Sequence, residues 1–171
     1  MRFLFWGGIN MGMNGRSVLI FVYDKDHDGE GLFTDKYILV GEQTSLSQEQ
    51  SVNLVEAGHK TVANQQYVYG KGEATLSIEA LAFMPTDKDQ KGLLVLQNSY
   101  KNRKKAYVKR AVFDGTSTSD VEYAEVVVES ISFEYPDDDV STVSVELKAN
   151  GPFTTEPPTI VDSEVSGSVT D

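Results

Sequence analysis

The residues best suited to chemistry form an acidic cluster near the N-terminus: Asp24, Asp26 and Asp28, followed by Gly29. Carboxylates at alternate positions with glycine at the sixth resemble the start of a calcium loop, because Ca²⁺ takes oxygen ligands and the glycine permits a tight turn. The twelfth position holds Asp35, where a longer bidentate glutamate is usual, and the flanking segments have strand character. The three aspartates are therefore calcium candidates, but we favour a solvated acidic hairpin loop and assign no metal.

The other acid–base residues do not form a catalytic pattern. His27 and His59 are the only histidines, and neither has the spacing of a Ser/His/Asp triad or of a zinc site. The aspartates at 137–139 could serve as general acids, but after Pro136 they are typical of a solvated turn. Cysteine is absent, which excludes disulfides, thiol nucleophiles and Cys-based metal sites. We predict no catalytic residue and no cofactor; an enzyme based on 137–139 is the least favoured alternative.

A basic stretch at residues 101–110 holds six of the fifteen cations. It could bind single-stranded nucleic acid, with Tyr100 and Tyr107 available for stacking, or it could be a solvated helix end. We favour a third interpretation, an electrostatic contact with acidic loops of a neighbouring copy. The chain carries a net charge of -11, so like subunits need such a patch in order to approach one another.

Length and composition indicate one ordinary domain. The chain has 171 residues, 40% of them hydrophobic and 24% charged, as in an average globular protein. The acidic balance repels nucleic acid phosphate, which argues against sequence-specific DNA recognition. No stretch approaches the ~20 apolar residues that span a bilayer. The first ten residues lack the features of a signal peptide.

Residues 1–13 have the character of an N-terminal arm, and Met1, Met11 and Met13 are all possible starts. Its aromatic side chains are too apolar to be left in water, so we expect them to contact a partner or the body. At the other end, residues 154–171 are rich in Pro, Ser and acidic residues and predict an extended C-terminal tail.

Between these ends the hydrophobic pattern predicts strands. Residues 17–23 are apolar on both alternating faces, which predicts a strand covered on two sides, the second cover being another subunit. A second strand is expected at 36–41. Residues 42–72 are polar and predict a long functional loop with a possible strand at 51–55. Residues 73–83 alternate as a half-buried strand does.

The second half predicts one helix and three more strands. Thr86 and Asp89 form a capping-box variant for a helix that runs to about Asn102. Strands follow at 106–113, with a turn at Asp114–Gly115, and then a long hairpin pairs 124–135 with 140–149. We predict that the strand at 17–23 and this hairpin build an inter-subunit sheet. The fold class is mostly β: a β-sandwich with one flanking α-helix.

Four segments together resemble the siphophage major tail protein, or tail tube protein, family. They are MNGRSVLIFVY, VGEQTSLSQEQ, ATLSIEALAF and ISFEYPDDDVSTVSVELKANGPF. Family members open with a short Asn-Gly-Arg-like start, continue with a Gly-x-x-Thr-Ser-Leu segment, and close with an acidic hairpin that ends in Gly-Pro. The matching positions are Asn14, Gly15, Arg16, Gly41, Thr44, Ser45, Leu46, Asp138, Asp139, Val140, Thr142, Ser144, Val145, Leu147, Gly151 and Pro152; Val143 and Ala149 depart from the pattern.

The resemblance implies a structural subunit of the virion, assembled in the host cytoplasm, with a tail tube domain at 14–153. Six copies would form a ring, and stacked rings would form a tube. Its lumen would hold the tape measure protein and conduct DNA during ejection, and its ends would meet terminator and distal tail proteins. The loop 43–72, the arm 1–13 and the tail after 153 would make contacts between rings. The alternative from the residues alone is a calcium-dependent β-sandwich binding or adhesion module.

Overall fold

A computed structural model of the protein describes residues 18–29, 35–57, 66–82, 91–137, 139–165 and 167. Its elements follow one another as β1 (Val18–Tyr23), β2 (Tyr37–Leu39), β3 (Gln43–Glu56), β4 (Tyr67–Leu81), α1 (Gly92–Asn102), β5 (Ala106–Phe113), β6 (Thr118–Glu134), β7 (Thr142–Ala149) and the 3₁₀ turn η3 (Asp162–Glu164). The prediction of a mostly β fold with one flanking helix is confirmed. No helix among these residues is long and apolar enough to cross a membrane.

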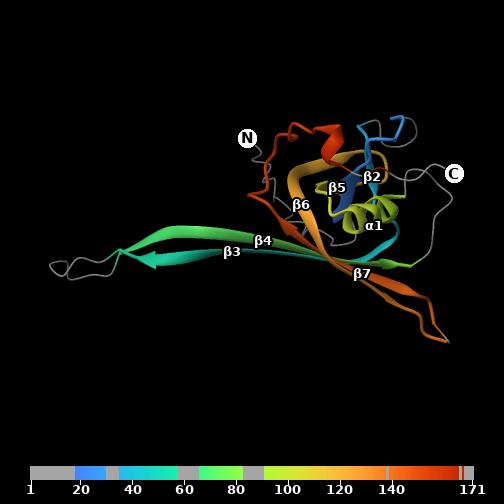
Figure 1. Ribbon diagram of the computed structural model, residues 1–171, viewed down its shortest axis with the longest axis horizontal. Coiled ribbons are helices and arrows are strands. Elements are labelled where there is room, and N and C mark those ends of the chain that lie inside the picture. The colour runs from blue at the N-terminus through green and yellow to red at the C-terminus, as the bar shows by residue number, and fades with distance from the viewer. Residues whose placement is uncertain are drawn as a thin grey trace, which may run out of the picture.

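The seven strands form one continuous antiparallel sheet in the order β2-β1-β5-β6-β7-β4-β3 (Figure 1). Where the sequence predicted a sandwich, the strands thus hydrogen-bond in a single sheet, in which β6 curves strongly around the body. The helix α1 packs against β6, β1 and β2. The main core fills the space beneath it, with Ile20, Leu76, Leu96 and Val145 among its fully buried members.

Strand β1 is covered on both faces within the chain. Ile20 and Val22 belong to the main core. Phe21 points the other way into a second cluster with Tyr37, and Ile160 from the C-terminal segment packs there. The expectation that another subunit provides the second cover is therefore wrong. The prediction that 17–23 builds an inter-subunit sheet is wrong too, because β1 already lies between β2 and β5.

The segment predicted as a long loop forms most of a β-hairpin. β3 and the start of β4 pair from Gln43↔Ala80 to Glu56↔Tyr67, and this ribbon projects far from the body (Figure 1). The loop prediction is wrong for 43–56 and 67–72, although the possible strand at 51–55 is confirmed within β3. The error has a physical cause: neither face of the distal ribbon meets the core, so the sequence shows no alternation of apolar and polar residues.

The helix begins at Gly92, while the predicted capping residues Thr86 and Asp89 lie outside the described residues. A Cβ at Gly92 would lie 2.5 Å from the carbonyl oxygen of Leu39 and 2.9 Å from Cγ1 of Val22. Glycine is therefore required for the helix to approach β2 and β1, despite its poor helix propensity. The helix ends at Arg103, which adopts the left-handed conformation with φ of 53°.

The remaining strands agree with the sequence analysis. β5 and β7 lie where they were predicted, and β6 begins six residues earlier than expected, at Thr118 instead of Ala124. The turn after β5 is confirmed: Asp114 accepts hydrogen bonds from the backbone N–H groups of Thr116 and Ser117. The described part of 154–165 is mostly irregular and folds back on the body, where buried Val165 bridges to Lys105.

Candidate assembly surfaces

The three calcium candidates Asp24, Asp26 and Asp28 lie in different environments, and Asp28 is exposed. Asp24 is buried and accepts a hydrogen bond from the backbone N–H of Asp26. Asp26 is exposed and pairs with Lys25 at 2.7 Å. Asp35, at the twelfth loop position, pairs with Lys109. No group of three or more His, Asp or Glu side chains in the described part of the chain is arranged to hold a metal ion. Calcium binding at this loop stays a prediction.

The other candidate acid–base residues are spread over the molecule. His27 is buried, and its backbone N–H donates to the Asp24 carbonyl. His59 and Asp138 lie outside the described residues. Asp137 and Asp139 are exposed at the turn between β6 and β7, as expected for a solvated tip. Of these residues, the described ones, His27, Asp137 and Asp139, do not form one cluster.

Most of the basic stretch is engaged within the chain. Lys105 pairs with Glu125 at 3.1 Å, and Arg110 pairs with Glu122 at 2.9 Å. Lys109 pairs with Asp35. The preferred contact with a neighbouring copy is therefore wrong for these three cations. Lys109 and Arg110 on β5, and Lys105 just before it, reach carboxylates on other elements of their own chain.

Lys109 is only 2% exposed. Its ammonium lies over the rings of Phe21 and Tyr37, at 5.0 and 5.3 Å from their centroids. Cation–π contacts together with the Asp35 carboxylate offset the cost of burying this charge. Burial, followed by the nearby Tyr123 and Asp35, raises the pKa of the Tyr37 phenol well above its ordinary value.

Glu125 joins three parts of the fold. It accepts hydrogen bonds from the Tyr107 hydroxyl at 3.2 Å and from the Asn150 amide at 2.9 Å, and it pairs with Lys105. Burial alone would raise the pKa of this carboxyl, but the hydrogen bonds from Asn150, Lys105 and Tyr107 outweigh it and lower the pKa. The ionised form of Glu125 is therefore the one that stabilises the junction of β5, β6 and the chain after β7.

The distal part of the β3–β4 ribbon exposes apolar side chains on both faces. In the antiparallel register Leu54 lies opposite Tyr69, and Val55 lies opposite Val68. Since neighbours along a strand alternate, Leu54, Tyr67 and Tyr69 share one face, while Val55 and Val68 share the other. All five are at least half exposed, and Tyr69 is 84% exposed. Isolated two-stranded ribbons are marginal in water, so this one calls for cover from outside its own chain.

A polar sheet face runs across β3, β4, β7 and β6, opposite the core. The cross-strand registers place on it Ser45, Ser47, Glu49, Glu73, Thr75, Ser77, Glu79, Ser130, Ser132, Glu134, Ser144, Glu146 and Lys148. Val127, which lies opposite Lys148, is on this face as well. Lys148 is held by Glu129 at 2.8 Å. The face is thus rich in serine and glutamate, and its one cation in this set is paired. Such a surface is hydrated and negatively charged.

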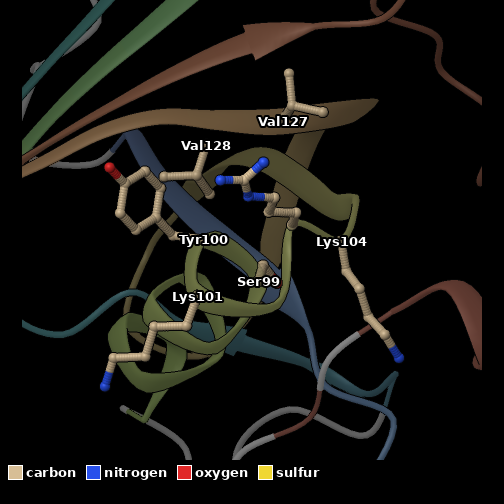
Figure 2. A pocket seen from close by; sticks show the side chains of 7 residues that line it. Ser99, Tyr100, Lys101, Lys104, Val127 and Val128 are labelled. Atoms are coloured by element: carbon tan, nitrogen blue, oxygen red, sulfur yellow. The ribbon is translucent and has the colours of Figure 1, made fainter.

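An open pocket of about 520 Å³ lies where the C-terminal end of α1 approaches β6. Figure 2 shows Val127 and Val128 on the strand side and Tyr100 on the helix side. Lys101, Arg103 and Lys104 complete the lining. The pocket therefore has an apolar wall and a cationic rim.

No protein-family model and no curated protein matches the chain. Solved structures do match. A chain from the tail of an empty gene transfer agent particle, determined with C6 symmetry, has a TM-score of 0.63 at 11% identity, covering 85% of this chain and 100% of that one. The SPP1 tail tube gives 0.62 at 13% identity, with 82% and 77% coverage. The chain has the tail tube fold.

A third match extends this fold to a contractile assembly. A chain from the sheath–tube complex of the PVC extracellular contractile injection system has a TM-score of 0.59 at 13% identity, covering 85% of this chain and 92% of that one. The fold implied by the resemblance is therefore confirmed. The apolar residues of the ribbon were not predicted as functional residues. The pair Tyr67 and Tyr69, in an otherwise polar segment, could have indicated them.

Proposed function

We propose that this protein is a structural, non-catalytic subunit of a bacteriophage tail tube, which forms stacked hexameric rings. The lumen would hold the tape measure protein during assembly and conduct DNA during ejection, and the tube ends would meet terminator and distal tail proteins. One observation carries the proposal: a ribbon with apolar residues on both faces projects from a tail tube fold. Neither face can be covered by the body from which it projects.

The ribbon has enough apolar surface to drive assembly. Burying a Val, Leu or aromatic side chain fully gives roughly 1.5–3 kcal/mol, so a side chain that is half exposed gains about 1 kcal/mol when a neighbour covers it. The five residues Leu54, Val55, Tyr67, Val68 and Tyr69 would together contribute several kcal/mol per subunit. Repetition around a ring and along a tube multiplies such a contact, so each one can be weak while the assembly is stable.

The polar sheet face supports the conduit part of the proposal. We assign it to the lumen wall. Its glutamates repel phosphate, and its serines and threonines offer no apolar or aromatic surface on which bases could stack. DNA would therefore pass without adhering. The same strands carry the main core on their other face, so the wall and the core are built by one set of alternating residues.

This assignment gives each segment of the chain a role. Residues 14–153 would form the tube domain, while the arm 1–13, the ribbon and the chain after 153 would supply contacts between rings. The distal ribbon then needs a partner surface that the body of its own copy does not provide.

Negative-stain electron microscopy of the purified protein at high concentration tests the proposal. We expect rings or hollow tubes from the natural sequence, and none from Leu54→Ser with Tyr69→Ser. The control is Thr116→Ala, an exposed position on the turn after β5 and away from the ribbon, which should leave assembly intact. If the protein with its natural sequence sediments as a monomer at every concentration, the proposal is wrong.

A further inference from the structure

The pocket beside α1 has a composition that specifies its occupant. Val128 and Tyr100 provide apolar surface on the helix side of β6, and Lys101 and Arg103 are exposed at its edge. A guanidinium and an ammonium beside an apolar wall fit a segment that carries both carboxylates and an apolar or aromatic side chain. The volume of about 520 Å³ falls within the ~300–1,000 Å³ that proteins use to bind small ligands, so it can accept an aromatic side chain.

The turn between β6 and β7 carries this combination. Tyr135 is 69% exposed, and its ring stacks on that of Phe133 at 5.9 Å with an interplanar angle of 1°. Asp137 and Asp139 follow it and are exposed. The stacking holds the tyrosine ring in place before any contact, so little side-chain freedom remains to be lost on docking. We call residues 134–140 the acidic tip.

The other acidic segments among the described residues are less suitable. Asp24 is buried, and Asp26 is paired with Lys25. Asp114 accepts hydrogen bonds from two backbone N–H groups of its own turn. Neither segment presents an exposed aromatic side chain next to its carboxylates. The ribbon also presents tyrosines, with Glu56 opposite Tyr67, but Lys71 lies two residues from Tyr69. The acidic tip carries no cation, so it is the better match for a cationic rim.

The acidic tip is too far from the pocket of its own chain to dock in it. Val128 lies on β6 and Tyr135 follows the end of that strand, seven residues later; at about 3.3 Å per residue the chain separates them by roughly 23 Å. We propose that the acidic tip of one copy docks in the pocket of the next, with Tyr135 against Val128 and Tyr100 and the tip carboxylates on Lys101 and Arg103. This inference rests on the proposed function and names one contact by which copies join.

The contact joins unlike surfaces, so it is heterologous and repeats from copy to copy. It also accounts for the two cations that the intramolecular ion pairs of the basic stretch leave at the pocket. The pocket lies on the body and the tip projects beyond it (Figures 1 and 2). Each subunit thus offers one donor and one acceptor surface, as a closed ring or a continuous array needs.

Engineered disulfides test the contact directly, because the chain contains no cysteine. One protein carries Tyr135→Cys and another carries Val128→Cys; the two are mixed, oxidised and analysed on non-reducing gels with mass spectrometry. We expect a disulfide between unlike chains. The matched comparison replaces Tyr135→Cys by Tyr69→Cys, which tests the ribbon as occupant. Deletion of residues 1–13 tests whether the arm occupies the pocket: the deletion should leave the cross-link yield unchanged.

Charge reversal provides an independent measurement. Asp137→Lys with Asp139→Lys makes the tip basic, and Lys101→Glu with Arg103→Glu makes the rim acidic. Each variant alone should raise the concentration needed for assembly at least about tenfold, because like charges then meet. An equimolar mixture should restore assembly, since every tip then finds a pocket of opposite charge. All four positions are exposed, and circular dichroism checks that each variant is folded.

The outcomes separate this inference from the proposed function. Tubes that form without the Tyr135–Val128 cross-link, or that form equally well from either charge-reversed variant, overturn the contact and leave the tube role standing. A cross-link through Tyr69, or a much higher yield once the arm is deleted, assigns the pocket to another occupant and also overturns it. A Tyr135–Val128 cross-link in samples that never form rings or tubes supports the contact and removes the tube. Absence of both overturns both.

Discussion

Replacing Gly92 by alanine distinguishes two opposite expectations. Helix propensity alone predicts that alanine stabilises the helix by about 1 kcal/mol. The structure predicts the reverse, because the new methyl group would meet backbone atoms of Leu39 at 2.5 and 2.9 Å and the Val22 side chain at 2.9 Å. Leu39 is held in β2 by its pairing with β1, and Val22 is fully buried, so neither can move away cheaply.

The expected loss can be worked out from these terms. Overpacking a well-filled site costs typically 1–3 kcal/mol, and we take about 3 because the contacted atoms are backbone and buried. The gain in propensity offsets about 1 kcal/mol, which leaves a destabilisation of roughly 2 kcal/mol. For a chain of this size each kcal/mol corresponds to about 2–4 °C, so Tm should fall by about 4–8 °C.

Urea unfolding followed by far-UV circular dichroism measures this difference. The assembly-deficient background Leu54→Ser with Tyr69→Ser keeps the protein monomeric, so that association does not contribute to the measured stability. The control is Gly151→Ala, where a Cβ would meet nothing within 4 Å. That change should be neutral or slightly stabilising. A Gly92→Ala protein as stable as the parent, or more stable, would refute the claim that glycine is required for the close approach of α1 to β2.

Three further predictions concern charge. The pKa of Glu125 is lowered in the folded state, so its stabilisation is present above the ordinary value of 4.5 and is lost as pH falls through the folded pKa; Glu125→Gln should therefore lower Tm at neutral pH and flatten its fall between pH 5 and 3. Asp35→Asn should destabilise the chain by roughly 2 kcal/mol in urea unfolding, because it leaves the Lys109 ammonium buried without its carboxylate, and adding Lys109→Met should recover most of the loss. Glu79→Lys with Glu146→Lys should leave tubes intact but make them retain DNA in co-sedimentation, with retention that falls as salt rises; tubes that do not retain DNA would contradict the lumen assignment.

Those parts of the fold with a core on one side could be predicted from the sequence. Residues 74–80 alternate because one face of β4 covers the main core and the other faces solvent, and the observed burial follows that alternation. The return strand β7 shows the same pattern for the same reason. The turn at Asp114 was also readable, since its chemistry is local and involves only the next three residues.

Features that depend on distant parts of the chain could not be predicted. Lys109 finds Asp35, 74 residues away, and no local pattern announces this pairing. The basic stretch therefore looked like a free patch when most of it stabilises β5. Gly92 looked like a flaw in a helix because its reason lies in β2, at Leu39. In both cases the role of the residue depends on a neighbour that is distant in sequence: Asp35 for Lys109 and Leu39 for Gly92.

The apolar pattern of β1 predicted a contact with another subunit that the structure does not need, and the polar pattern of the ribbon concealed one that it does need. A run that is apolar on both faces suggested an absent partner, yet β1 is covered on both faces and paired along both edges by its own chain. The real demand for partners comes from the ribbon, where ordered strands leave apolar side chains exposed on both faces. A two-fold dimer covers one patch with its own copy, so it would leave the other ribbon face in water. Only contacts that repeat from copy to copy cover both faces, and those generate rings and tubes.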